Sequence, residues 1–242
     1  MSTDRPKADM RIGVISCSGG ATFLEAHQAV QPLGELAPTF HVVTDRPCGI
    51  ESHCDERGIG RTRIEEQDID RFCSEASRVL VEEQGVSLVL LFFHRVVTKA
   101  LWGRVPTLNI HPSILPAYQG FSPLKRALAD GVKEFGATLH LATDAVDAGP
   151  ILAQVRQSMP VSATLEMLNR MSFIQKTCLT LLACEALVTD RYVFDLEKGA
   201  ASFNTQSESQ GSLSQTFVTD AYRDAFAAVQ LRHDVPGPAI EF

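Results

Sequence analysis

The run from Val86 to Phe93, V-S-L-V-L-L-F-F, constrains the fold more than any other feature of the chain. It is nearly all apolar, whereas a strand with one face in water would alternate apolar and polar residues. A continuous apolar run of this length is typical of a parallel strand that is covered on both faces. Such a strand needs helices on both sides of its sheet. The chain is therefore expected to be an α/β protein with a mostly parallel, twisted sheet and helices on both faces.

The rest of the first 190 residues alternates strand-like and helical patterns. A helical pattern follows the first glycine turn and another covers 68–84, and a long helix is predicted to begin at a Ser162 cap. A shorter helix is predicted from Ser122, as the N-cap before Pro123, to Gly131. In sheets of this class ligands bind at the carboxyl ends of the strands. Further strands are predicted at 11–16, 40–44, 107–110, 137–142 and 151–155.

The character of the sequence changes after about Thr189. Residues 199–215 are rich in serine, glutamine and glycine and are predicted to form a loop or linker. A short amphipathic helix with Tyr222, Phe226 and Val229 follows, and then a proline-containing end. We therefore expect a main domain over residues 1–190 and a C-terminal extension over 191–242. The extension either covers an edge of the sheet or joins a partner subunit in a homodimer, and covering the edge is favoured.

Composition argues against several classes of function. The formal net charge is −7 and no basic patch offsets it, so no nucleic-acid surface is expected. No apolar run reaches the roughly 18 residues of a membrane span, and the polar N-terminus lacks the apolar core of a signal peptide. The six cysteines show no C-x-x-C pair, so we expect reduced thiols and no metal site. The expected setting is the cytoplasm, with no membrane association.

The segment Asn109–Gly120, N-I-H-P-S-I-L-P-A-Y-Q-G, carries the strongest signal of function. If a strand precedes Pro112, the side chains of Asn109 and His111 point to the same face at its C-terminal end. Downstream, the Gly/Pro-rich loop D-A-V-D-A-G-P supplies a carboxylate at Asp147. An amide donor, an imidazole and a carboxylate together suit acyl transfer. Each residue alone is more often a cap, a core residue or a surface group, but the full pattern is far rarer.

These motifs resemble those of the folate-dependent formyltransferase family, most of all its glycinamide ribonucleotide branch. The resemblance runs from Arg11 to about Leu187, and it implies a Rossmann-like sheet of about seven strands. It also implies 10-formyltetrahydrofolate as the donor, an amine as the acceptor and no metal. By position the family's catalytic residues fall on Asn109, His111 and Asp147. Asn109 would donate to the developing oxyanion, His111 would stabilise that oxygen or move a proton, and Asp147 would raise the basicity of the imidazole.

The family also implies a pterin pocket between two backbone segments, a turn after the buried strand and the loop that bears Asp147. Core packing is the alternative explanation for the apolar residues of the turn, whereas an arginine directly after an apolar strand seldom serves packing. His94 stands where the family more often has methionine, which need not prevent folate binding because backbone groups make most pterin contacts. The expected folate-binding residues are Phe93, His94, Arg95, Val96, Val97, Leu141, Ala142, Thr143 and Asp144.

The acceptor side departs from the family pattern. The turn reads S-G-G-A-T-F where the glycinamide ribonucleotide branch has S-G-N-G-S-N, so two asparagines are replaced and Phe23 predicts a more apolar pocket. Amides at the helix N-terminus still offer an anion site. Lys176 is either a phosphate anchor or a solvated charge. The candidate acceptor-binding residues are Ser18, Gly19, Gly20, Ala21, Thr22 and Lys176.

The segment G-F-S-P-L at 120–124 is more similar to formyltransferases that act on methionyl-tRNA or amino sugars. The acidic charge disfavours tRNA, so we expect a small-molecule amine acceptor other than glycinamide ribonucleotide. The alternatives are a glycinamide ribonucleotide formyltransferase, a formyltetrahydrofolate hydrolase and a non-catalytic folate sensor. A hydrolase would use the same three residues with water as the acceptor, whereas a sensor would not need all three.

Overall fold

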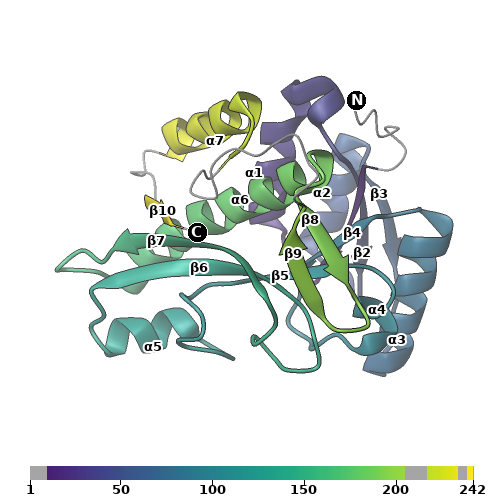
Figure 1. Cartoon of the computed structure of the whole chain (residues 1–242), viewed down its shortest axis with the longest axis horizontal. Coiled ribbons are helices and arrows are strands. Elements are labelled where there is room, and N and C mark those ends of the chain that lie inside the picture. The colour runs from purple at the N-terminus through teal and green to yellow at the C-terminus, as the bar shows by residue number, and fades with distance from the viewer. Residues whose placement is uncertain (1–9, 205–216, 234–238, 242) are drawn as a thin grey trace.

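The computed structural model describes residues 10–204, 217–233 and 239–241, and in this part of the chain one large sheet is covered by helices on both faces (Figure 1). The order across this sheet is β10-β7-β6-β5-β4-β1-β2-β3. Its strands are β1 (Arg11–Ser16), β2 (Thr39–Thr44), β3 (Gly60–Arg63), β4 (Leu88–Phe92), β5 (Thr107–His111), β6 (Glu134–Leu141), β7 (Ile151–Ser158) and β10 (Ala239–Glu241).

Helices connect most of the neighbouring strands. A 3₁₀ segment, η2 (Gln31–Leu36), extends α1, and a π-helical turn, η3 (Arg78–Glu83), extends α3. Two further strands, β8 (Tyr192–Asp195) and β9 (Ala200–Phe203), form a separate hairpin. The α-helices are α1 (Ala21–Val30), α2 (Gly49–Arg57), α3 (Ile69–Ser77), α4 (Lys99–Trp102), α5 (Pro123–Ala129), α6 (Leu165–Val188) and α7 (Asp220–His233).

Five neighbouring strands of the sheet are parallel, in the order β3, β2, β1, β4 and β5. The two main cores lie on the two faces of this half of the sheet. Side chains alternate along β4, so that Leu88 and Leu90 belong to the core under α1, α2 and α6. Val89 and Leu91 belong to the core under α3 and α4. The predicted parallel strand with two covered faces is therefore confirmed, and with it the expected α/β fold.

The other half of the sheet is antiparallel. β6 runs antiparallel to both β5 and β7, and β10 adds to the outer edge of β7. The described sheet therefore has eight strands rather than about seven, because β10 of the extension covers the edge as favoured above. Two loops lie beside each other and are joined by contacts described below. One is 112–122, at the carboxyl end of β5, and the other is 142–150, between β6 and β7.

The C-terminal extension packs on the main fold rather than standing apart from it. The predicted amphipathic helix is α7, and Tyr222, Phe226 and Val229 are buried against α1 and α6. The backbone N–H groups of Val218 and Thr219 donate to the buried carboxylate of Glu185 on α6 at 3.0 and 2.8 Å. The expected loop at 199–215 is wrong at 200–203, which form β9, and its residues 205–215 lie outside the described part.

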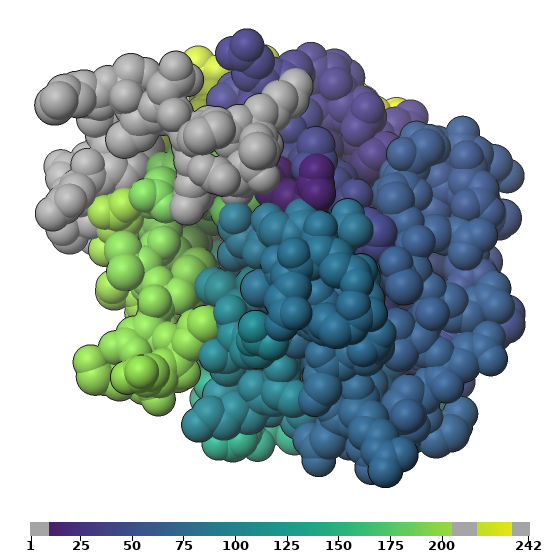
Figure 2. Space-filling model, turned by 90° about the vertical axis from the view of Figure 1, so that its right-hand side faces the viewer, coloured from purple at the N-terminus to yellow at the C-terminus, as the bar shows by residue number. Residues whose placement is uncertain are grey.

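The β8–β9 hairpin stands beside the blue-teal surface in Figure 2, where it is drawn in yellow-green. Its turn reaches the loop between β6 and β7, because a Cβ added at Gly199 would lie 3.4 Å from Thr143 Cγ2. The extension therefore contacts one wall of the candidate site described below.

One of the two predicted helix caps is wrong. The cap of α6 is Thr164, whose side chain accepts a hydrogen bond from Met167 N, and not Ser162. Ser122 is the N-cap residue of α5 and Pro123 its first residue, as predicted, although at a φ of 54° the Ser122 side chain makes no cap hydrogen bond. α6 is long and apolar enough to cross a membrane, yet most of it is buried inside this fold, so the core accounts for its apolar residues.

Candidate active site

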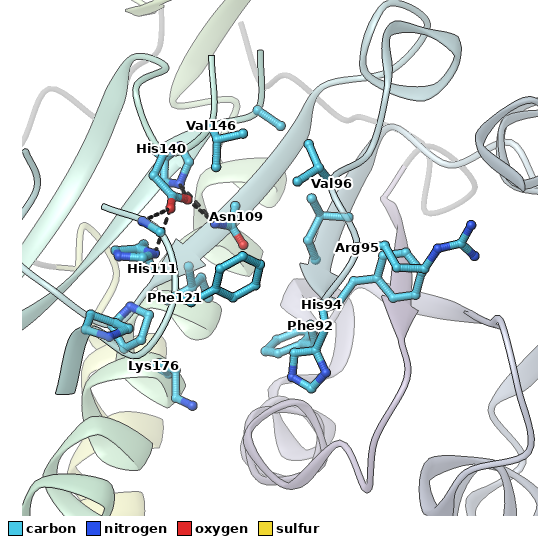
Figure 3. Close-up of a pocket in the computed structure, with 18 of the residues that line it drawn as sticks. Phe92, His94, Arg95, Val96, Asn109, His111, Phe121, His140, Val146 and Lys176 are labelled. Atoms are coloured by element: carbon cyan, nitrogen blue, oxygen red, sulfur yellow. Dashed lines mark hydrogen bonds and ion pairs between the residues drawn. The ribbon is translucent and has the colours of Figure 1, made fainter. Parts of the chain in front are cut away.

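Asn109, His111 and Asp147 converge at the carboxyl end of β5 (Figure 3). Asp147 Oδ2 lies 3.3 Å from His111 Nδ1, and Asp147 Oδ1 accepts from Asn109 Nδ2 at 3.3 Å. The two β5 residues reach the same carboxylate because they are two apart on a strand and share a face. The structure therefore places the three predicted residues within hydrogen-bond reach of one another.

His140 is a fourth member of this cluster, and the sequence reasoning missed it. It lies on β6 directly opposite Asn109 in the antiparallel register. Its Nε2 is 3.0 Å from Asn109 Nδ2 and 3.6 Å from Asp147 Oδ1, while its Nδ1 is 3.2 Å from Leu141 O. An available signal was the period-2 pattern of 137–141, in which His140 and Thr138 are polar among apolar neighbours.

The Asp147 loop is held to the loop that precedes α5. Asp147 Oδ2 accepts from Gly120 N at 2.9 Å, and Asp147 O accepts from Gln119 Nε2 at 2.9 Å. Burial raises the pKa of Asp147, but the His140 imidazole, the Gly120 N–H and His111 outweigh burial, so this pKa lies below its usual value. The carboxylate is therefore charged at neutral pH.

The hydrogen bonds of His111 define where its proton lies. Nε2 is 2.9 Å from Tyr118 O, and a carbonyl oxygen only accepts, so Nε2 carries a hydrogen. Nδ1 lies 3.3 Å from Oδ2 of the charged Asp147 carboxylate. Both ring nitrogens of His111 therefore face oxygen acceptors.

Both hydrogens of the Asn109 amide nitrogen are engaged within the cluster. Nδ2 only donates, so its partners are His140 Nε2 and Asp147 Oδ1. In Figure 3 the amide oxygen of Asn109 points away from Asp147. Donation to an oxyanion, as predicted from the sequence, therefore requires that one of these two bonds be given up.

A cavity of about 790 Å³ lies beside the cluster, in the size range of small-molecule sites. Its wall on one side is the turn after β4 together with the loop between β6 and β7. Its wall on the other side comes from the start of α1 and the first half of α6. The predicted folate-binding residues that line it are Phe93, His94, Arg95, Val96, Val97, Ala142 and Thr143.

Three predictions about the folate side are corrected by the structure. Leu141 does not line the cavity, because its side chain is buried in the core under α6. Asp144 is exposed outside it. Arg95 contributes to the wall, but its guanidinium turns away and donates to the carbonyls of Glu66 and Gln67 at 2.9 and 2.6 Å. This arginine does serve packing, contrary to the expectation, since it also lies over the rings of Phe72 and Phe93.

The acceptor turn lines the cavity through Ser18, Gly20, Ala21 and Thr22, whereas Gly19 does not. The prediction that Phe23 makes this pocket apolar is wrong. Phe23 is fully buried and packs edge-on against Phe40, because its position on α1 faces the sheet. Gly20 is required here, since its φ is 68° and a Cβ would lie 2.5 Å from Ile50 Cδ1.

Exposed apolar side chains gather around the cavity. Phe121, Val96 and Val146 all line it, and they are 84%, 53% and 51% exposed. Figure 3 shows Phe121 between the cluster and Val96. Among the described residues no three His, Cys, Asp or Glu side chains are placed to hold a metal ion.

The chain is similar to known proteins over most of its length. Residues 10–179 match the formyl transferase family. The methionyl-tRNA formyltransferase of Chlorobium luteolum is 29% identical over 171 residues, which are 69% of this chain and 49% of that protein. The formyltetrahydrofolate deformylase of a Synechocystis species is 32% identical over 124 residues, 50% of this chain and 44% of that protein. The chain thus spans less than half of the length of these two relatives.

Among solved structures, glycinamide ribonucleotide transformylase 1 of Symbiobacterium toebii superposes with a TM-score of 0.69 at 28% identity. The match covers 78% of this chain and 92% of that one. The likeness therefore extends over nearly the whole of that protein.

Proposed function

Because the chain belongs to the formyl transferase family, we propose that it moves a formyl group from 10-formyltetrahydrofolate to the amine of a small-molecule acceptor other than glycinamide ribonucleotide. The observation that carries this proposal is the cluster of Asn109, His111 and Asp147 at the wall of a cavity with two different sides. One side suits a pterin and the other an amine acceptor.

The chemistry requires that a neutral amine attack the formyl carbon and that a tetrahedral intermediate form. The carbonyl oxygen of the formyl group then becomes an oxyanion. In our mechanism the His111 ring, held by Asp147 and Tyr118 O, stabilises this oxygen. Asn109 adds a hydrogen bond by turning one amide hydrogen from His140 to the oxyanion, while the other stays on Asp147.

Collapse of the intermediate transfers the formyl group. The bond from the formyl carbon to the folate nitrogen breaks, and that nitrogen takes up a proton while the former amine loses one. Asp147 is charged and within reach of His111, so it can accept the amine proton through a water or through the imidazole. The products are the formamide and tetrahydrofolate.

The folate side of the proposal rests on the turn 93–97 and the loop 142–147. Exposed Val96 and Val146 line the cavity there. Calorimetry with 5-formyltetrahydrofolate tests this part directly, because that folate does not require an acceptor. We expect saturable binding to the folded protein, and no binding would refute the proposal.

The acceptor is proposed to differ from glycinamide ribonucleotide because the turn before α1 lacks both asparagines of that branch. Gly20 and Phe23 stand at those positions, and neither directs a polar side chain into the cavity. Each lost hydrogen bond to a charged group costs about 1.5–3 kcal/mol. We expect kcat/KM for glycinamide ribonucleotide below ~10⁴ M⁻¹s⁻¹, the lower end for ordinary enzymes. A kinetic screen of amines that includes glycinamide ribonucleotide and amino sugars checks this. A kcat/KM above this value for glycinamide ribonucleotide would identify that compound as the acceptor.

Hydrolysis of formyltetrahydrofolate is the second candidate, and the Synechocystis deformylase relative is the observation in its favour. The same cluster would then activate water. Formate release measured with and without an amine separates the two functions. A transferase releases tetrahydrofolate only when the amine is present, whereas a hydrolase releases it at the same rate without one.

A further inference from the structure

Phe173 gives α6 an aromatic side chain at the wall of the cavity. It lines the cavity together with Asn169 and Lys176, and their spacing of four and three residues places all three on one face of the helix. Figure 3 shows Lys176 on this helix. The Phe173 side chain is only partly buried, whereas Ser172 and Ile174 on either side of it are buried in full. The acceptor side of the cavity therefore includes the surface of an aromatic ring.

The C-terminal extension reaches this ring. The imidazole of His233, the last residue of α7, lies with its centroid 5.0 Å from the centroid of the Phe173 ring, and the two planes meet at 65°. Such an edge-to-face arrangement is one of the favoured geometries of two aromatic rings. His233 does not line the cavity itself. Any effect of His233 on the cavity therefore passes through Phe173.

Glu25 of α1 holds the end of α7 from the other side. Its Oε2 lies 3.3 Å from His233 Nε2, and its Oε1 accepts from Arg232 Nη2 at 2.6 Å. Glu25 is one helical turn beyond Ala21, which lines the cavity from α1. In Figure 1 α7 lies alongside α1 and α6, and it packs against both. The end of α7 thus joins the two helices that form the acceptor side of the cavity.

The contact with His233 restrains a side chain that the core does not enclose completely. A phenylalanine at the edge of a cavity can adopt more than one staggered rotamer. A second ring packed against it reduces this choice. A wall that is ordered before the ligand arrives loses less conformational entropy on binding, so the ligand binds more tightly.

We propose that His233 of the C-terminal extension is a positioning residue for formyl transfer, and that it holds the ring of Phe173 at the acceptor wall with Glu25 as its anchor. This inference rests on the proposed function, since it adds a residue of the extension to the same cavity. The extension is then part of the acceptor site as well as a cover for the edge of the sheet.

The order of the Phe173 ring is measured first, because this test needs no acceptor. 4-Fluorophenylalanine is placed at position 173, and ¹⁹F NMR relaxation is recorded in the full chain with His233, with His233→Ala and with His233→Phe. The chemical shift is not the readout, since the loss of a neighbouring ring changes it directly. We expect exchange broadening or a second signal in His233→Ala, and one ordered ring when His233 or phenylalanine is present. Unchanged relaxation in His233→Ala overturns the inference.

Steady-state kinetics then test the effect on the acceptor. The probe is whichever of glucosamine, glycine and glycinamide ribonucleotide the wild type uses with the highest kcat/KM. We expect His233→Ala to raise KM for this amine roughly 3- to 10-fold, the value of one aromatic pair, and to leave kcat unchanged. His233→Phe should keep the wild-type KM.

Tyr222→Phe is the matched control for loosening of α7. Tyr222 is buried on the same helix, about three turns before His233, and its hydroxyl bonds to Leu36 O. This variant should be less stable and yet keep the wild-type KM. An equal rise of KM in Tyr222→Phe and His233→Ala would mean that any loosening of α7 has this effect, and it would overturn the specific role of His233.

Binding of 5-formyltetrahydrofolate to the same variants separates this inference from the proposed function. The folate side lies on the other wall, so His233→Ala should bind this folate as the wild type does. If the folate binds and an amine is used with equal KM in wild type and His233→Ala, this inference alone fails. If the ring at position 173 responds to His233→Ala but the folate does not bind, the proposed formyl transfer fails and the positioning of Phe173 stands.

Discussion

Asp147 is the residue on which the site depends, since it contacts both His111 and Asn109 and also the backbone of Gly120. We expect Asp147→Asn to lower kcat by roughly 10²- to 10⁴-fold, the range for removal of a group that assists proton transfer. The carboxylate charge beside His111 is lost, while the folate wall is unchanged. Steady-state kinetics and calorimetry with 5-formyltetrahydrofolate separate the two effects.

Asp144→Asn is the matched control for this variant, because Asp144 is an exposed carboxylate on the same loop that does not line the cavity. It is expected to keep the wild-type kcat. An Asp147→Asn enzyme that retains more than about a tenth of the wild-type kcat would contradict the role of Asp147, since general acid–base groups contribute at least ~10²-fold.

Phe121 is expected to matter for ligand binding and not for folding. Its side chain is 84% exposed at the cavity, so Phe121→Ala should change the free energy of unfolding by no more than about 0.5 kcal/mol. It should weaken the binding of a ligand that covers the ring by roughly 3- to 30-fold, as expected for a partly lost aromatic contact. Titration of folate and of the best acceptor checks both. Leu231→Ala on α7 is the control, because Leu231 is 83% exposed and does not line the cavity.

At the scale of elements, Glu51 ties α2 to two strands. Its buried carboxylate accepts from Thr44 of β2 at 2.6 Å and from Arg63 Nε of β3 at 2.8 Å. The hydrogen bond from Arg63 outweighs burial and lowers the pKa of Glu51 to about 2. We expect Glu51→Gln to reduce the free energy of unfolding by roughly 1.5–3 kcal/mol at pH 7.

The pH dependence of this loss follows from the lowered pKa. A carboxyl group with a lowered pKa in the folded state stabilises the fold fully above its unfolded value, and this contribution is lost as pH falls through the folded value. The difference between wild type and Glu51→Gln should therefore shrink between about pH 4.5 and about pH 2. Denaturant unfolding over this range measures it, with Glu56→Gln, an exposed change on the same helix, as the control. A difference that stays constant would show that the charge of Glu51 is not involved.

Local sequence patterns predicted the elements whose cause is local. The apolar run at 86–93 predicted β4, and the spacing of Asn109 and His111 predicted that both reach one site, because strand periodicity alone requires it. His140 depends instead on the antiparallel register of β6 against β5, a pairing of residues 31 positions apart. Nothing within one segment determines that register.

The remaining errors have similar physical causes. Phe23 was expected to make the pocket apolar and Arg95 not to serve packing, but the direction of each side chain is set by tertiary contacts, with Phe40 in one case and the 66–67 backbone in the other. Ser122 is the N-cap residue of α5 as predicted, but at its positive φ the side chain makes no cap hydrogen bond. The strands β8 and β9 have only four residues each, too few to show a clear strand pattern.

At the scale of the whole molecule, the C-terminal extension is continuous with the main core. Tyr222 of α7 is fully buried, and its hydroxyl donates to Leu36 O at 2.8 Å across a separation of 186 residues. Phe226 and Val229 belong to the same core as α1 and α6. We therefore expect residues 10–204 and α7 to unfold together, although the sequence suggested a boundary near residue 190.

Tyr222→Ala tests this expectation. Loss of the buried ring should reduce the free energy of unfolding by about 3–5 kcal/mol, the range for truncation of a large aromatic core residue. Part of this loss comes from Leu36 O, which is left without its donor, so Tyr222→Phe should cost only about 1–3 kcal/mol. Leu231→Ala, on the exposed side of the same helix, should leave the stability unchanged.

If α7 belongs to the cooperative unit, calorimetry of Tyr222→Ala shows one transition at a lower temperature, and circular dichroism and intrinsic fluorescence give the same midpoint. Two transitions, with only the first shifted by the substitution, would mean instead that the extension folds on its own and merely rests on α1 and α6.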